Sequence, residues 1–215
     1  MLRVLVTGFE PFGDSPVNPS EQAARALAGA PLPGLDVAAA VLPVTYAGAL
    51  PALCAAIARH DPDVVLAAGL AGGRPHISVE RIAINIDDAR IADNDGMRRV
   101  DTPVVAGAPA AYFATVPIKA ITAAIRTAGV PAEVSQSAGT FLCNHIFYQS
   151  CHIAAIERPG LRTGFLHLPW LPKQAIGRPG APSMTLAAML DALRAALGAL
   201  HTNRTDLAIA EGTAS

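Results

Sequence analysis

Short apolar runs typical of β-strands alternate along the chain with longer segments of helical character. The run at residues 62–69 is almost continuously apolar, as expected for a strand covered on both faces of a sheet. The last helical segment is amphipathic. The predicted strands are residues 2–8, 36–44, 62–69, 76–88, 132–139 and 162–170, and the predicted helices are residues 18–29, 45–60, 116–129, 143–158 and 183–201.

This alternation predicts a single α/β domain over residues 1–201, with three α/β/α layers around a central mixed, largely parallel sheet. A chain of 215 residues is long enough for one such domain with a substantial core. The first helix is predicted to start with a capping box, with Asn18 as N-cap, Pro19 as the first helical residue and Glu21 as the third. Residues 202–215 are expected to form a frayed tail.

Charge and composition exclude several classes of protein. The formal net charge is −1 and 15% of residues are charged, whereas a nucleic-acid-binding protein usually carries a basic stripe. Residues 37–58 carry no formal charge, but prolines and a glycine interrupt them, so a strand, a turn and a packed helix are expected there rather than a membrane span. The N-terminal apolar run is too short for a secretory signal, and three cysteines form no disulfide framework. These features predict a cytoplasmic protein.

Cys143 is the most informative of the three cysteines. It follows a loop of small residues and stands where a helix is predicted to begin. Unpaired backbone N–H groups and the helix dipole at such a position lower the pKa of a thiol and can bind an oxyanion. Cys54 and Cys151 lie inside helices rich in alanine and isoleucine, and both are expected to be small buried residues. Position alone leaves Cys143 as either a nucleophile or a third buried residue.

A metal site is a weaker interpretation of the same segment. Cys143, His145, Cys151 and His152 are close in sequence, but on one helix His145 lies about 200° around the axis from Cys143. His145 and His152 are separated by roughly 10 Å along that axis, so one tetrahedral ion cannot collect all four side chains. No metal is therefore expected.

A cysteine nucleophile needs a base, and the base needs a group that orients it. His167 lies near the carboxyl end of a late apolar strand, at the edge where α/β sheets usually bind ligands. Glu80 lies among β-branched residues, where a buried carboxylate would need a specific partner. Its neighbour Arg81 should point to the opposite face of the strand. A hydrogen-bonded core histidine and an edge-strand ion pair remain the alternatives for His167 and Glu80, and the competitors for the orienting role are Asp87, Asp88, Asp93 and Asp95.

Six segments together resemble the pyrrolidone carboxyl peptidase (pyroglutamyl peptidase type I) family of cysteine peptidases. They occur in family order across nearly the whole chain, and this ordered combination is highly specific. The segments are "VLVTGFEPFGDSPVNPS", "GLAGGR", "ERIAINIDDARIADNDG", "PAAYFATVPIKA", "SAGTFLCNHIFY" and "GFLHLPWLP".

The resemblance implies an enzyme that removes N-terminal pyroglutamate from peptides through a thioester acyl-enzyme, without cofactor or metal. It implies that Cys143, His167 and Glu80 form the catalytic triad. In the mechanism expected for such a triad, Arg90 assists the backbone N–H groups at the oxyanion. The resemblance also implies an α/β fold, a cytoplasmic location and a homo-oligomer, most simply a tetramer. The basic segment 96–103 departs from the family pattern, which puts the tetramer in question if that loop lies at a subunit contact.

Pyroglutamate is a compact neutral lactam, so its site should have apolar walls and a few polar groups for the ring amide. The candidate wall residues are Phe9, Phe12 and Phe141, for which ordinary core packing is the alternative. Asn18 is expected to serve only as a helix cap.

Two other functions remain open at this stage. One is a different hydrolase or a phosphorylase-like enzyme on a related α/β scaffold, although the sequence contains no P-loop, GxGxxG or GxSxG motif. The other is a module that binds pyroglutamyl peptides without cleaving them. Thiol-dependent turnover separates the cysteine peptidase from both.

Overall fold

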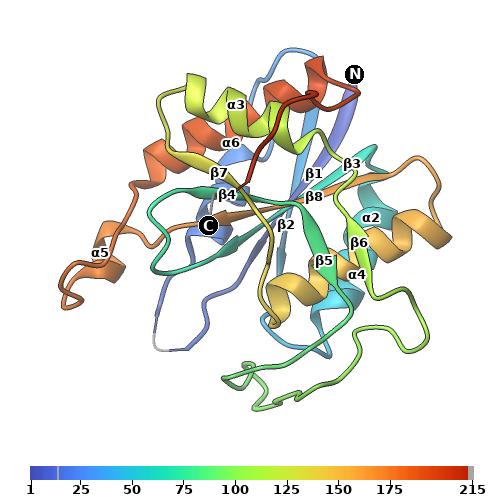
Figure 1. The fold of residues 1–215 in the computed structure, drawn as a ribbon, viewed down its shortest axis with the longest axis vertical. Coiled ribbons are helices and arrows are strands. Elements are labelled where there is room, and N and C mark those ends of the chain that lie inside the picture. The colour runs from blue at the N-terminus through green and yellow to red at the C-terminus, as the bar shows by residue number, and fades with distance from the viewer. Residues whose placement is uncertain (14, 213–215) are drawn as a thin grey trace.

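The computed structural model describes residues 1–13 and 15–212, which fold into three layers with a twisted sheet between two layers of helices (Figure 1). The sheet has six strands in the order β2-β1-β3-β8-β4-β7. These strands are β1 (Leu2–Phe9), β2 (Leu35–Leu42), β3 (Val64–Leu70), β4 (Ile77–Glu80), β7 (Ala132–Ser135) and β8 (Arg162–Leu168).

The sheet is mixed but mainly parallel, as the sequence predicts. Strands β2, β1, β3 and β8 run parallel to one another, whereas β4 runs antiparallel to β8 and parallel to β7. The central strands β1 and β3 are buried along most of their length, which explains their continuous apolar sequence.

The helices form two layers, one on each face of the sheet, and each layer packs on the sheet around its own apolar core. Residues of α1, α3 and α6 pack on one face, where Leu27, Ile121 and Leu193 are fully buried. Residues of α2 and α4 pack on the other face around Leu53 and Phe147. The helices are α1 (Pro19–Leu27), α2 (Ala49–His60), α3 (Ile118–Thr127), α4 (Leu142–Ile156), the short α5 (Pro172–Ala175) and α6 (Leu186–Thr202).

The single long strand predicted over residues 76–88 is wrong, because the chain changes partner at Arg81. The Arg81 N–H still donates to the carbonyl of Ser135, the last residue of β7, but the Arg81 carbonyl accepts from Ala114 N. The chain then continues as β5 (Ile82–Ile84), which pairs antiparallel with β6 (Ala111–Phe113) in a second sheet. The Asn144 side chain also binds the backbone N–H and carbonyl of Ile84, and this ties β5 to the first turn of α4.

Two helix starts can be compared with their predicted caps. Asn18 caps α1 as expected, since its side chain accepts from Ser20 N at 3.0 Å. The predicted capping box is not formed, because the Glu21 carboxylate accepts a hydrogen bond from Arg25 Nε at 3.0 Å and does not turn back to the N-cap. Helix α2 begins at Ala49, after the predicted start at Thr45, because the Thr45 hydroxyl accepts from Gly48 N and closes a turn before the helix.

The segment 203–212, expected to fray, packs against α3 and the start of β5. The Asp206 carboxylate accepts hydrogen bonds from Lys119 N and Ala120 N at the start of α3. Further along, Glu211 pairs with Arg126 at 2.6 Å and accepts from Arg81 through its carbonyl. The expected fraying therefore does not describe this part of the chain, and residues 213–215 lie outside the described residues.

Residues 37–58, which lack formal charge, form most of β2, a turn and most of α2. None of the described helices is long and apolar enough to cross a membrane.

Candidate active site

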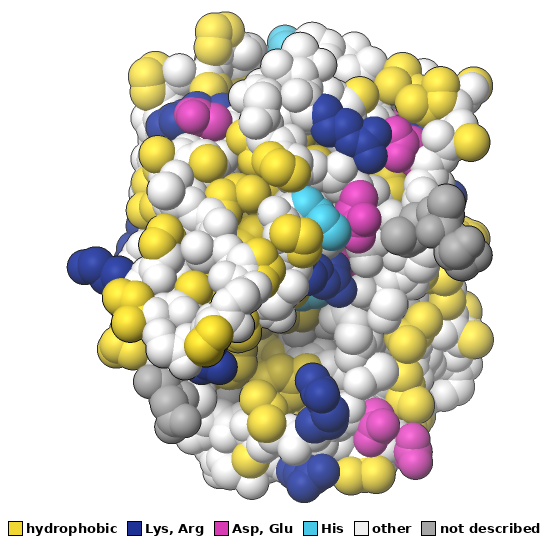
Figure 2. All heavy atoms as spheres, turned by 60° about the vertical axis from the view of Figure 1, so that its left-hand side comes forward, with side chains coloured by type: hydrophobic (Ala, Val, Ile, Leu, Met, Phe, Trp, Pro, Cys, Tyr) yellow, Lys and Arg dark blue, Asp and Glu magenta, His cyan; other side chains and the backbone are white. Residues whose placement is uncertain are grey.

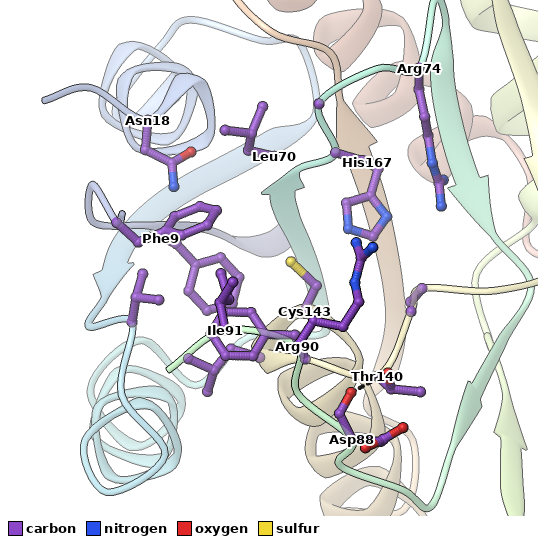
Figure 3. A pocket seen from close by; sticks show the side chains of 18 residues that line it. Phe9, Asn18, Leu70, Arg74, Asp88, Arg90, Ile91, Thr140, Cys143 and His167 are labelled. Atoms are coloured by element: carbon purple, nitrogen blue, oxygen red, sulfur yellow. Dashed lines mark hydrogen bonds between the residues drawn. The ribbon is translucent and has the colours of Figure 1, made fainter. Parts of the chain in front are cut away.

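Cys143 and His167 line one cavity, at the edge where β3 and β8 end. His167 is the second-last residue of β8, and Cys143 is the second residue of α4. Gly69 of β3 lets the thiol approach the sheet, because a Cβ at this position would lie 2.7 Å from Cys143 Sγ. The fold thus joins a late strand and a helix start, as the sequence predicts, and Figure 3 shows the sulfur beside the imidazole.

Glu80 contacts the other side of the imidazole. Strand β4 pairs antiparallel with β8, and Ser78 lies opposite His167, so Glu80 is the diagonal neighbour of the histidine on the same face. The Nδ1–H of His167 donates to Glu80 Oε1 at 2.7 Å. Glu80 is fully buried and His167 is 3% exposed, so a low-dielectric environment strengthens this hydrogen bond. Arg81 reaches away from this contact to the carbonyl of Glu211.

Arg74 is a site residue that the sequence reasoning missed. Its Nη1 donates to the same Glu80 oxygen at 2.7 Å, and its Nη2 donates to Ser137 O at 3.0 Å. The guanidinium therefore neutralises the buried carboxylate and ties it to the loop before α4. The available signal was Glu80 itself, because a buried carboxylate requires a cation or several donors nearby.

Two of the competing aspartates, Asp87 and Asp93, are engaged elsewhere, whereas Asp88 lines the cavity itself. Asp87 is fully buried and accepts from His145 Nδ1 at 2.9 Å and from Arg99 Nη1 at 2.8 Å. Asp93 accepts backbone hydrogen bonds from Tyr46 N, Asp95 N and Met97 N. Arg99 belongs to the basic segment 96–103, and its ion pair with Asp87 of the same chain neutralises part of the positive charge of that segment.

The protonation state of the nucleophile differs from the expectation. Burial, together with the charge of Glu80, raises the pKa of the Cys143 thiol to about 12, although the charge of Arg74 acts in the opposite direction. A helix N-terminus contributes at most about 2 kcal/mol, which is too little to offset a change of this size. The resting thiol is therefore protonated at neutral pH, and its proton must move during the reaction.

The cavity in front of the thiol has a volume of about 630 Å³ and mainly apolar walls (Figure 3). The three phenylalanines expected as walls line it, and Phe141 packs against Phe12 at 6.3 Å and Tyr46 at 5.9 Å between ring centroids. Phe9 is otherwise buried in the core, so the cavity and packing interpretations both hold for it. Asn18, expected only as a cap, also lines the cavity.

Arg90 reaches the cavity from the loop after β5. Its side chain points toward Cys143 and His167 (Figure 3). Two hydrogen bonds fix this loop to the start of α4: Thr140 Oγ1 donates to Asp88 O at 2.7 Å, and Asp88 N donates to Thr140 O at 2.9 Å. These bonds hold the chain two residues before Arg90 beside the start of α4.

The remaining cysteines and histidines do not join this site. Cys151 is buried, as predicted, and lies 3.2 Å from Thr163 Oγ1. Cys54 is exposed on α2, so the prediction that it is buried is wrong; the face of α2 that it occupies points to solvent. His152 contacts Tyr112 Oη at 3.0 Å. Within residues 1–13 and 15–212, no group of three or more Asp, Glu, His or Cys residues is arranged to hold a metal ion.

A family model described as pyroglutamyl peptidase matches residues 2–203. The chain belongs to the pyroglutamyl peptidase family. Pyrrolidone-carboxylate peptidase 1 of Ralstonia nicotianae is 49% identical over 212 residues, covering 99% of each chain. The pyrrolidone-carboxylate peptidase of Chromobacterium violaceum is 55% identical over 197 residues, covering 92% of this chain and 91% of the other.

Solved structures of pyroglutamyl peptidases share the fold. Pyroglutamyl peptidase I of Bacillus amyloliquefaciens matches with a TM-score of 0.95 and 39% identity, over 97% of this chain and 99% of the other. A mutant pyrrolidone carboxyl peptidase of Pyrococcus furiosus matches with a TM-score of 0.89 and 42% identity, over 93% and 98% of the two chains. These relatives favour the peptidase over the phosphorylase-like enzyme and the non-catalytic binder.

Proposed function

We propose that this protein is a cysteine exopeptidase that removes N-terminal pyroglutamate from peptides, with Cys143 as nucleophile, His167 as general base and acid, and Glu80 as the orienting carboxylate. The observation that carries the assignment is the Glu80–His167 hydrogen bond of 2.7 Å beside a cysteine at the start of a helix, in one apolar-walled cavity. The chain belongs to a family of peptidases with this specificity.

The reaction begins with a neutral thiol, because burial raises the pKa of Cys143 to about 12. Sγ attacks the carbonyl carbon that links pyroglutamate to the next residue, and its proton passes to His167. Glu80 holds Nδ1–H, so that Nε2 is the nitrogen that takes the proton, and the carboxylate stabilises the resulting imidazolium. His167 then protonates the leaving amine. Water activated by His167 hydrolyses the thioester and releases pyroglutamate.

The oxyanion of each tetrahedral intermediate faces donors at the start of α4. The first N–H groups of a helix have no partner within the helix, and Phe141 at the N-cap supplies no side-chain acceptor. The N–H of Cys143 is therefore free to donate to the oxyanion, and Arg90 assists from the opposite loop. Losing one such donor typically costs about 3 kcal/mol of barrier.

We further propose that the substrates are pyroglutamyl peptides and that the enzyme is a cytoplasmic homotetramer, with no nucleic acid or membrane as partner. Free Cys54, Cys143 and Cys151 fit a reducing compartment. Phe113 on β6 is 67% exposed, and such a side chain is common at a subunit contact. Light scattering of the purified protein tests the assembly, and a monomer at micromolar concentration would contradict it.

The decisive experiment compares hydrolysis of fluorogenic amides of pyroglutamate, proline and glutamate. The pyroglutamyl amide should be cleaved far faster than the others, because proline lacks the lactam carbonyl and glutamate brings charge into an apolar pocket. Iodoacetamide and Cys143→Ser should abolish turnover, while Cys54→Ser serves as the matched control and should keep it. Turnover by Cys143→Ser comparable to wild type would remove Cys143 from the nucleophile's role.

A further inference from the structure

A second cavity adjoins the catalytic one and has no role in the chemistry described above. Its volume is about 600 Å³, and it shares Phe12 and Leu70 with the catalytic cavity. Leu70 is the last residue of β3, next to the Gly69 that packs on the nucleophile. The two cavities are therefore neighbours, and Phe12 and Leu70 stand between them.

Trp170 connects the two cavities. On one side, its ring lies so close to Gly72 of the catalytic cavity that a Cβ on the glycine would be 2.1 Å from the ring. On the other side, the guanidinium of Arg178 lies 4.7 Å from the ring centroid. Trp170 therefore holds Arg178 at a fixed place beside the catalytic cavity, in a cation–π contact.

The walls of the second cavity are tied together by Gln174 of α5. Its Nε2 donates to Ser15 Oγ at 2.8 Å and to Val17 O at 3.1 Å, which fixes the loop between β1 and α1 to α5. This side of the molecule is in view in Figure 2, which shows hydrophobic and basic side chains around hollows of the surface.

The charge of the second cavity has one sign among its described wall residues. Lys173 and Arg178 line it, and no acidic side chain among the described residues does; Asp14, between the wall residues Gly13 and Ser15 in the sequence, lies outside the described residues. By contrast, the catalytic cavity is lined by the acidic Asp88 as well as by Arg74 and Arg90. A basic patch beside an aromatic ring attracts carboxylates that arrive on a flexible chain.

We propose that the second cavity is a subsite for the residues that follow pyroglutamate, and that it favours acidic side chains there, which pair with Lys173 and Arg178. This inference rests on the proposed function, because the pyroglutamyl group must occupy the catalytic cavity for the rest of the peptide to reach Trp170. The subsite acts on affinity, while the bond that is cleaved remains the same.

Trp170 is the only tryptophan of the chain, so its fluorescence reports on the subsite directly. In Cys143→Ala, which cannot form the thioester, we would titrate two amidated peptides, pyroglutamyl-Ala-Glu-Glu and pyroglutamyl-Ala-Lys-Lys. The glutamate peptide should bind about threefold to tenfold more tightly, and 0.5 M salt should reduce the difference. Lys173→Glu and Arg178→Glu in the same background should each abolish or reverse the preference, whereas Arg194→Glu on α6 is the matched surface control.

Cleavage of the same peptides by the active enzyme gives a second measurement, with each rate expressed relative to the fluorogenic pyroglutamyl amide. The ratio of kcat/KM for the glutamate over the lysine peptide should fall in Lys173→Glu. Equal affinities for the two peptides, absence of binding, or a preference that Lys173→Glu and Arg178→Glu leave intact would overturn the subsite. Failure of the proposed function would instead appear as no hydrolysis of the fluorogenic amide by the wild type, while the affinity ratio in Cys143→Ala would still be measured.

Discussion

Glu80→Gln is expected to slow the enzyme much less than amide substitutions usually do at the orienting carboxylate of a triad. In the structure one oxygen, Glu80 Oε1, accepts from both Arg74 Nη1 and His167 Nδ1, each at 2.7 Å. A glutamine that places its carbonyl oxygen there keeps both donors satisfied. The flipped amide would turn its NH₂ toward the guanidinium and leave two donors in contact, so Arg74 selects the productive orientation and the correct tautomer of His167.

The magnitude follows from what the substitution removes. Hydrogen bonds to charged groups are worth about 1.5–3 kcal/mol and neutral ones about 1 kcal/mol, so the imidazolium loses at most about 2 kcal/mol of stabilisation in the transition state. This corresponds to a fall in kcat of at most roughly 30-fold. In Ser-His-Asp triads the equivalent change lowers kcat about 10⁴-fold because it stabilises the wrong tautomer. The new NH₂ would occupy the place of Glu80 Oε2, a buried atom without a partner among the described residues, and this costs stability as well.

The assay is kcat for the fluorogenic pyroglutamyl amide in Glu80→Gln, Arg74→Met and the double variant, with circular dichroism to verify folding. In the double variant nothing selects the orientation of the amide, so its loss should exceed the product of the two single losses and approach 10⁴-fold. His167→Ala provides the reference for an enzyme without a base. A loss in Glu80→Gln alone as large as that of His167→Ala, or strictly multiplicative losses, would refute the role assigned to Arg74.

Three further outcomes are expected. In His167→Ala, the rate at which iodoacetamide alkylates Cys143 can be followed by mass spectrometry. This rate should rise about tenfold per pH unit from neutral pH to about pH 11, because burial raises the pKa of the thiol to about 12. A plateau below pH 9 would contradict this. Asp206→Ala should destabilise the protein by about 1 kcal/mol in urea unfolding, because the tail then no longer caps the start of α3. Asp191→Ala, at an exposed position of α6, should change stability by less than about 0.5 kcal/mol. Truncation after residue 203 should cost at least as much as Asp206→Ala, and an unchanged midpoint would mean that the tail does not stabilise the fold.

The sequence suffices for the parts of the site that follow from local position. A cysteine at a predicted helix start and a histidine near a strand's carboxyl end are readable from periodicity, since these ends meet at one edge of an α/β sheet. Arg74 could not be placed in this way. Its contact with Glu80 depends on the conformation of the loop between β3 and β4. Glycines in that loop allow many backbone conformations, so the sequence does not predict where the Arg74 side chain lies.

Other errors have the same origin in tertiary contacts. The break at Arg81 arises because β7 and β6 offer hydrogen-bond partners on either side of one residue, and local propensity does not record this. The exposure of Cys54 depends on which face of α2 packs against the sheet. In an alanine-rich helix the contrast between apolar and polar faces is weak, so the sequence does not indicate which face is buried. The thiol pKa was misjudged because the helix terminus is visible in the sequence, whereas the depth of burial is not.

The charges around the cavity explain why an uncharged lactam suits this site. Arg74 and Glu80 neutralise each other behind the imidazole, and the cavity wall adds one cation, Arg90, and one anion, Asp88. Proton transfer from Cys143 to the imidazole creates a thiolate and an imidazolium side by side, so the total charge of the cluster stays at zero through the first step. A neutral ring entering the cavity preserves this balance, whereas an N-terminal ammonium or a side-chain carboxylate would add a charge to it and would lose its hydration against the apolar part of the walls. Selectivity and catalysis therefore depend on the same feature, a site that is electrically balanced before the substrate arrives.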